Sequence, residues 1–323
     1  MKRRRILLLL FCILGFAAIP ELRAQLGLEI SLNRRVYMRY EPVYACVTIR
    51  NDSGRPLLFG KDPRLQGFVL FEIRDSRGRV VPQRPGVDIS VTGMLLGPGE
   101  IKNMVIPVQK YYELDRCDDY SINVFVSHNR LPEEYQSRDT YFRIDDGIKV
   151  WSRTVGIADV TGESRGDTPA KERTYSVYAL SEGSSKFYYL VVEDKKRTYG
   201  VMRVGREIGR EKFSAEVDML SRIHLLMPIS PRVFHYLSFS IDGETIDNSY
   251  WKTSSTIPML YRDPKSGMVA RIGGAEARVG IDFRDPNRGT MTAAQILSEN
   301  TNSFAPPRKK KAEGLVELGK GIK

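Results

Sequence analysis

The sequence is poor in the residues and motifs on which many catalytic sites depend. Its 323 residues include three cysteines, three histidines and two tryptophans. It has no HExxH zinc motif, no paired CxxC and no glycine-rich phosphate loop that continues into Lys and Ser or Thr. These absences exclude the best-known nucleotide-dependent and zinc-peptidase classes, and we expect no cofactor.

Residues 1–24 have the pattern of an export signal. A basic start, KRRR, is followed by an apolar run over 6–19. The run is too short for a comfortable membrane span and is typical of a cleaved signal peptide. We expect cleavage after Ala24; cleavage after Ala17 or Ala18, or retention as an uncleaved anchor, are the alternatives. The sequence therefore predicts a periplasmic or extracellular protein.

The positive charge of the chain is concentrated at its two ends. The formal net charge is +11. Residues 1–24 hold five basic residues and one acidic residue, and the tail over 306–323 holds six and two, so the body carries only about +3. This distribution argues against nucleic-acid binding. A short helical segment is predicted over 286–305, and membrane contact is expected only through Arg308–Lys311 in a disordered tail.

Alternating apolar residues predict an all-β fold. Val43, Ala45, Val47 and Ile49 alternate with larger or polar side chains, which is the period of a half-buried strand. Further short strands, separated by turn clusters and without a helical period, predict a β-sandwich over 25–148.

Two motifs in this first domain carry a resemblance. YMRYEPV over 37–43 and VTIRNDSGRPL over 47–57 resemble the opening of bacterial envelope immunoglobulin-like and fibronectin type III-like modules, with Tyr40 at the usual glycine position. The opening is also similar to that of bacterial proteinase-inhibitor and macroglobulin-type sandwiches. Tyr120, six residues after Leu114, is similar to the tyrosine corner of these folds, whose hydroxyl bonds back to the backbone. The resemblance implies an Ig-like sandwich with a spacer, adhesion or binding role and no chemistry of its own.

The remainder of the chain predicts a second antiparallel β domain. A polar, turn-rich stretch over 149–173 predicts a linker, and strand patterns resume over 174–285. A faint repeat, FYYL at 187–190 and FHYL at 234–237, has the spacing of propeller blades, but too few units fit for a closed ring. We expect a two-sheet sandwich or open barrel, with partial propeller-like repeats as the alternative.

Two cysteines, Cys46 and Cys117, follow the predicted signal peptide. Two cysteines in an exported chain invite a disulfide. Cys46 alternates out of phase with the apolar positions of its strand, so its side chain is predicted to face outward. We expect two separate thiols, with a Cys46–Cys117 bridge as the alternative.

Three residues form a candidate metal or acid–base site. His224 and His235 flank a predicted hairpin, and Asp218 precedes its first strand. One register places the two histidines opposite each other, and a shift of one residue places His224 opposite Tyr236 instead. In the first register, Asp218 completes a metal site or orients a histidine base. Hydrogen-bonded structural histidines are the alternative.

The repeat also predicts a binding surface. Tyr188 and His235 occupy equivalent positions in its two copies, and strand alternation points them away from the face that carries the neighbouring Phe and Tyr rings. Amphipathic rings at exposed positions are favoured at interfaces. The alternative is that both faces are buried, between sheets or under the first domain.

These observations support three functions. The leading hypothesis is an exported, non-catalytic binding or interaction protein whose partner is an envelope or extracellular protein or a polysaccharide. The second is a metal-dependent hydrolase centred on His224 and His235. The third, which the resemblance alone supports, is a secreted proteinase inhibitor.

Overall fold

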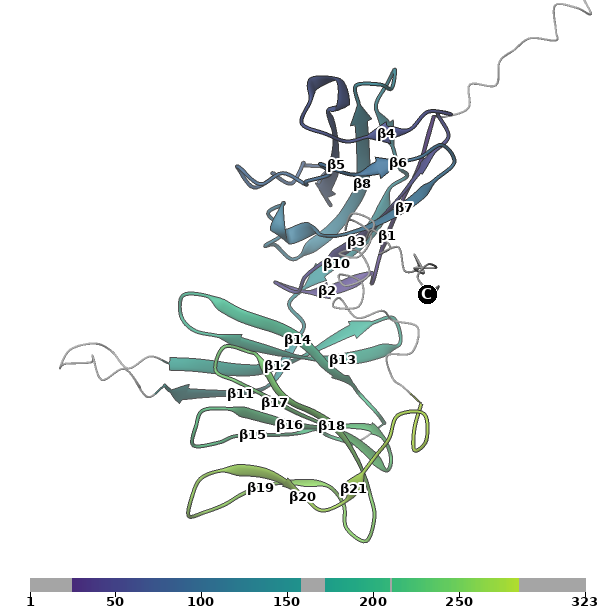
Figure 1. Ribbon diagram of the computed structural model, residues 1–323. Coiled ribbons are helices and arrows are strands. Elements are labelled where there is room, and N and C mark those ends of the chain that lie inside the picture. The colour runs from purple at the N-terminus through teal and green to yellow at the C-terminus, as the bar shows by residue number, and fades with distance from the viewer. Residues whose placement is uncertain (1–24, 158–171, 210, 285–323) are drawn as a thin grey trace, which may run out of the picture.

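The computed structural model describes residues 25–157, 172–209 and 211–284 and confirms an all-β fold. The predicted signal peptide over 1–24, the helical segment over 286–305 and the basic tail over 306–323 lie outside the described residues. No helix within the described part of the chain is long and apolar enough to cross a membrane. The strands form two domains that follow each other along the chain (Figure 1).

The first domain is built from two main sheets and a small one. One main sheet has the order β1-β3-β7 and the other β2-β10-β8-β5, with β9 beside β8; β4 and β6 form the small sheet. All pairs are antiparallel except β2 with β10. The elements are β1 Leu26–Leu32, β2 Val36–Met38, β3 Tyr44–Asn51, β4 Leu57–Leu58, η1 Pro63–Leu65, β5 Gly67–Asp75, β6 Leu95–Leu96, β7 Ile101–Pro107, η2 Val108–Lys110, β8 Asp118–His128, β9 Tyr135–Gln136 and β10 Thr140–Asp145.

The core of the first domain contains the residues that the alternating pattern predicted to face inward. Val43, Ala45, Val47 and Ile49 are fully buried in one cluster with the inward residues of β5, β7 and β8. The predicted bond from Tyr120 to the backbone is also present, because its hydroxyl donates to the carbonyl oxygen of Arg116 at 2.8 Å. Burial raises the pKa of Tyr120 to about 12, so the hydroxyl keeps the proton that it donates.

The second domain is a two-sheet sandwich with a hairpin on its outer side. Its sheets have the orders β11-β12-β13-β14 and β15-β16-β17-β18-β21, and β19 and β20 pair with each other in a two-stranded sheet. Apolar side chains of β12, β13, β16 and β17 meet between the sheets and form the core. The strands are β11 Ile148–Gly156, β12 Glu172–Glu182, β13 Ser185–Glu193, β14 Thr198–Arg206, β15 Ser214–Val217, β16 Ile223–Ser230, β17 Val233–Phe239, β18 Thr245–Lys252, β19 Met259–Arg262, β20 Val269–Ile272 and β21 Ala275–Glu276.

The sandwich is the expected architecture, whereas the propeller-like alternative and part of the predicted linker are wrong. The repeats over 187–190 and 234–237 lie in different sheets of one sandwich and do not form propeller blades. Residues 149–156 and 172–173 of the predicted linker are not linker, because they belong to β11 and β12, which pair with each other. Within the stretch, residues 158–171 lie outside the described residues. The two domains are joined instead by Asp146–Gly147, between the end of β10 and the start of β11.

A buried cluster holds the two domains together. Met38 of β2 packs with Leu180, Tyr189 and Val191 on the face of the β11–β14 sheet that is turned away from the sandwich core. Figure 1 shows this sheet nearest the first domain, the β15–β18 sheet beyond it, and the β19–β20 hairpin farthest away. The hairpin therefore presents a surface remote from the domain junction.

Candidate functional site

The turn between β15 and β16 gathers polar side chains around Asp218. The chain reverses between Asp218 and Arg222, with Ser221 in the left-handed backbone region at a φ of 59°. The Oδ1 atom of Asp218 accepts hydrogen bonds from the backbone N–H groups of Leu220 and Arg222, both at 2.9 Å. A side chain that bonds to its own turn in this way fixes the carboxylate in one orientation.

The second carboxylate oxygen of Asp218 faces two side chains of the β16 segment. Its Oδ2 atom accepts from Nε and Nη2 of Arg222, both at 2.7 Å, and lies 3.2 Å from Nε2 of His224. Burial alone would raise the pKa of Asp218, but the backbone and side-chain bonds from Arg222 and His224 outweigh it and lower the pKa. The carboxylate is therefore ionised and fully paired at neutral pH.

His224 continues this chain of contacts to Tyr236 on β17. Its Nδ1 atom lies 2.7 Å from the Tyr236 hydroxyl. Burial lowers the pKa of His224 although the Asp218 carboxylate opposes it, so the ring is neutral at pH 7. In a neutral ring only one nitrogen carries a proton. Nε2 then donates to Asp218, and Nδ1 accepts from the Tyr236 hydroxyl, whose pKa burial raises.

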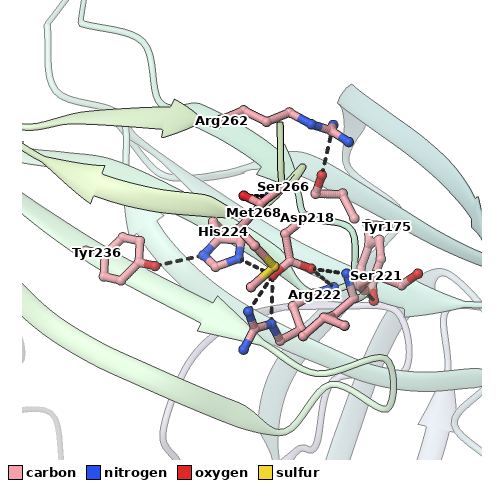
Figure 2. Close-up of polar contacts among 11 residues, drawn as sticks. Tyr175, Asp218, Ser221, Arg222, His224, Tyr236, Arg262, Ser266 and Met268 are labelled. Atoms are coloured by element: carbon pink, nitrogen blue, oxygen red, sulfur yellow. Dashed lines mark hydrogen bonds and ion pairs between the residues drawn. The ribbon is translucent and has the colours of Figure 1, made fainter. Parts of the chain in front are cut away.

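A carboxylate, an imidazole and a hydroxyl that are hydrogen-bonded in this order form the arrangement that activates a nucleophile. Here, however, the hydroxyl at the end of the series, that of Tyr236, is not exposed. The Tyr236 side chain is buried, and its pKa is raised and not lowered. The turn is also anchored on two sides (Figure 2). Tyr175 of β12 donates to the Ser221 carbonyl at 2.5 Å, and Arg262 of β19 donates to the Val217 carbonyl at 3.1 Å. The cluster therefore braces the turn between the facing sheet and the outer hairpin.

His235 does not join this cluster. The register between β16 and β17 places His224 and His235 on opposite faces of the sheet. The Nε2 atom of His235 lies 2.6 Å from Oδ1 of Asn248, and its ring stacks on Tyr250 with the centroids 4.4 Å apart. The predicted metal site of His224, His235 and Asp218 is therefore wrong. Among residues 25–157, 172–209 and 211–284, no three His, Cys, Asp or Glu side chains are grouped to hold a metal ion.

Tyr188 does not point outward either. Its ring lies in the core between the two sheets of the second domain, edge-on to Phe213 at 5.0 Å. Its hydroxyl donates to Oε1 of Glu207 at 3.2 Å. The next residue, Tyr189, lies on the other face and is buried against the first domain. Both faces of β13 are thus buried, which is the alternative, so Tyr188 does not form an exposed binding surface with His235, which is half-buried on β17.

Cys46 and Cys117 are both free thiols. Cys46 is half-buried on the outward face of β3, as the alternation predicted, while Cys117 is exposed just before β8. The alternative of a Cys46–Cys117 bridge is therefore not realised in the structure.

Sequence reasoning missed three features. The pentapeptide GESRG over 162–166 has the GxSxG spacing of a nucleophile turn, but polar residues precede it and it lies outside the described residues. The outward face of the β19–β20 hairpin is apolar and exposed, and an open hollow on the first domain contains the exposed ring of Tyr141. The signals that could have found the last two are the alternation of Met259 and Tyr261, and the position of Tyr141 two residues from the charged side chains of Asp139 and Arg143.

No protein-family model matches the sequence, and a search of curated proteins finds no match.

Proposed function

We propose that the chain is an exported, non-catalytic interaction protein whose first domain is Ig-like and whose β19–β20 hairpin docks an envelope or extracellular protein. The observation that supports this proposal is the exposed apolar face of the hairpin. Asp218 and His224 are hydrogen-bonded in a series that ends at the buried side chain of Tyr236, which favours a structural role for both residues.

The register of the hairpin separates its two faces. Met259 lies opposite Ile272, and Tyr261 lies opposite Ala270. Directly opposed residues share a face, so these four form one surface. Met259, Tyr261 and Ile272 are 56%, 48% and 39% exposed. We call this surface the docking face.

The other face of the hairpin is held against the sandwich. Arg262 bonds to the Val217 carbonyl, and the Arg271 guanidinium lies 3.1 Å from the centroid of the Trp251 ring. The backbone N–H of Met219 also donates to the Gly267 carbonyl at 3.0 Å in the hairpin turn. The docking face is therefore presented on a fixed support, which lowers the entropy lost when a partner binds.

The composition of the docking face argues for the chemistry of the partner. Residues 259–272 hold three basic residues and one acidic residue, but Arg262 and Arg271 lie on the opposite face of the hairpin and contact the sandwich, so the docking face itself is an apolar strip. Interfaces have an apolar centre. The occupant that fits is a protein that presents an apolar strip of its own.

Site-specific photo-crosslinking in the producing cell tests the docking face. A photoreactive amino acid replaces Met259 in the full chain, and the matched control carries it at Val80, which is 58% exposed on the first domain. We expect one major adduct with another protein from position 259 and none from position 80. The adduct is identified by mass spectrometry, and the purified partner is then titrated with the full chain.

Substitution separates docking from chance capture. Met259→Lys with Ile272→Lys should weaken binding of the purified partner at least tenfold, whereas Val80→Lys should leave it unchanged. A 259 adduct made of two copies of this chain, or no adduct at all, would contradict docking of a different protein.

Export is tested independently by sequencing the N-terminus of the mature protein from the producing cell. We expect it to begin at Gln25, or at Ala18 or Ile19 if cleavage occurs earlier. A mature chain that still begins at Met1 would rule out a cleaved signal.

A further inference from the structure

The outward face of β8 and β10 on the first domain carries an exposed aromatic ring among fixed polar groups. Tyr141 pairs with Ser121, and Arg143 pairs with Asp119. Because directly opposed residues share a face, the four side chains form a compact patch. The Tyr141 ring is 68% exposed, which is unusual for so large a side chain on a rigid strand.

The strands that carry this patch, β8 and β10, pack with their inner side chains in the core of the first domain. Phe142 and Tyr120, which point inward from the same two strands, stack with their ring centroids 5.3 Å apart. Tyr37 meets Phe142 edge-on at 5.9 Å. The backbone that carries Tyr141 is therefore fixed on its inner side, and the exposed ring stands on a rigid base.

An open hollow with a volume of about 540 Å³ lies over the patch. This volume is within the range of roughly 300–1,000 Å³ that is typical of small-molecule sites. The polar and aromatic side chains that line it and bear on the argument are those of Arg35, Asp75, Asp119, Ser121, Tyr141 and Arg143.

The polar groups of the hollow are held in place by their neighbours. Arg143 donates from Nε to Oδ1 of Asp119 at 2.7 Å and from Nη2 to Oδ2 at 3.1 Å, which makes a planar, two-pronged pair. Asp75 accepts from Nε of Arg79 at 2.7 Å and from the backbone N–H groups of Arg77 and Arg79. These hydrogen bonds orient Asp75, Asp119 and Arg143 on the surface, and groups that are already oriented reduce the cost of binding.

The composition of the hollow selects one class of ligand. It combines two cationic residues, Arg35 and Arg143, with two carboxylates, Asp75 and Asp119. The carboxylates disfavour a phosphate or sulfate, and the polar lining disfavours a purely apolar ligand. A neutral sugar ring fits both parts, because its C–H face packs on an aromatic ring while its hydroxyls bond to planar carboxylate and guanidinium groups at the ring edge.

We propose that this hollow is a binding site for a neutral oligosaccharide, with Tyr141 as the stacking platform and the Asp119–Arg143 pair as the hydroxyl-binding group. The site is on the other domain from the docking face and does not depend on it. Because the hollow is open and buries one side of a sugar chain, the dissociation constant should lie at roughly 0.1–10 mM.

Calorimetric titration of the full chain with soluble hexasaccharides tests the proposal. The probes are the hexamers of β-1,4-glucose, α-1,4-glucose and β-1,4-N-acetylglucosamine, with oligogalacturonate as the anionic comparison. We expect at least one neutral hexamer to bind and oligogalacturonate to bind at least tenfold more weakly. Tyr141→Ala and Arg143→Ala should each weaken the neutral sugar at least tenfold, while Tyr141→Phe, which keeps the ring, should stay within about threefold.

The matched control is Phe68→Ala, which removes an exposed aromatic ring of the same domain outside the hollow. It should leave sugar binding unchanged, and the melting temperature of Tyr141→Ala should stay within a few degrees of the unchanged protein. The site assignment is overturned if no neutral hexamer binds at 10 mM, if Tyr141→Ala binds as well as the unchanged protein, or if oligogalacturonate binds best. None of these outcomes bears on the protein partner of the hairpin.

Discussion

The guanidinium of Arg34, just before β2, donates from Nη1 to the hydroxyl of Tyr189 on β13 at 2.9 Å and so links the two domains directly. The same nitrogen lies 2.5 Å from Oε1 of Glu41. Glu41 is only 4% exposed, and burial raises its pKa although Arg34 opposes this. The contact between the domains therefore depends on a charge pair that has little access to water.

Removing Arg34 should destabilise the whole protein. Arg34→Ala leaves the Glu41 carboxylate buried without its cation, and breaking a buried pair typically costs about 3–5 kcal/mol. Arg35→Ala is the control, because Arg35 is the adjacent and exposed residue of the same charge. It should change the free energy of unfolding by less than about 0.5 kcal/mol. Urea unfolding measures both, and equal losses in the two variants would contradict a buried coupling.

The two histidines of the β15–β18 sheet, which lie on opposite faces of it, should make the protein less stable as the pH falls. Burial lowers the pKa of His224 and of His235 below the ordinary value of 6.5. Below about pH 6.5 the unfolded chain therefore binds protons that the folded chain does not, and stability is lost. Between pH 7.5 and 5.5, the unchanged protein should lose more free energy of unfolding than His224→Asn.

The same measurement on His235→Asn and on the double variant completes this test. Each single variant should lose part of the pH dependence, and the double variant should lose more than either. Glu41, whose raised pKa contributes the opposite slope, is present in all four proteins and cancels in the comparison. If the free energy of unfolding of the double variant depends on pH as steeply as that of the unchanged protein, the histidines titrate alike in the folded and unfolded states.

The alternation of apolar and polar residues predicted the strands and their buried faces well. It predicted poorly which residues of different strands lie opposite each other. Alternation identified the core side of β3, and most strands of the second domain lie in the range over 174–285 where strand patterns were predicted to resume. The sequence left two registers of the histidine hairpin open. An irregularity between Pro228 and Ser230 shifts the hairpin, so that Ser230 pairs with Val233, His224 pairs with Ser238, and the two histidines lie on opposite faces, as in one of the two alternatives. A shift of one residue exchanges the two faces of a strand, and the sequence does not contain that information locally.

The other errors also have physical causes. β11 is an exposed edge strand, rich in polar side chains, and such a composition is typical of a loop as well as of an edge. On β13 both faces are apolar, one for the sandwich core and one for the first domain, so alternation does not distinguish inward from outward at Tyr188. The Arg34–Glu41–Tyr189 contact joins residues more than 140 positions apart and had no sequence signal.

The hydroxyl of Tyr120 should contribute measurably to the stability of the first domain. Tyr120→Phe removes its bond to the Arg116 carbonyl and leaves that acceptor with one partner fewer. A single hydrogen bond of this kind contributes about 0.5–1.5 kcal/mol. Tyr141→Phe, which changes an exposed hydroxyl on a neighbouring strand, is the control and should be neutral within about 0.5 kcal/mol. Urea unfolding measures the free energy of unfolding of both variants. If Tyr120→Phe leaves it unchanged, the hydrogen bond does not contribute to stability.

Cys117 should alkylate slowly despite its exposure. Burial of the sulfur and the nearby Asp146 carboxylate raise the pKa of Cys117 to about 11. The thiolate is the reactive form, so the rate of reaction with iodoacetamide should rise about tenfold per pH unit from pH 7 to 9 without levelling off. Mass spectrometry of tryptic peptides follows the reaction at each pH. Asp146→Asn should raise the rate at pH 8, and a rate that already levels off near pH 8.5 would contradict the raised pKa.

Gly147 lies at the junction of the two domains, and a side chain at this position would clash with the backbone of β12. It has a φ of +63°, and a Cβ atom there would lie 2.8 Å from the Ala179 carbonyl oxygen, which belongs to the backbone of β12 and has little freedom to move. Gly183 has nearly the same φ, +60°, but no atom lies within 4 Å of the position its Cβ would take. Alanine at either position bears the left-handed strain of about 1–2 kcal/mol. Only Gly147→Ala adds a steric clash, which we expect to cost about 1–3 kcal/mol more. Equal losses in the two variants, measured by urea unfolding, would show that the junction moves aside freely and that the domains are not held at the angle seen in the structure.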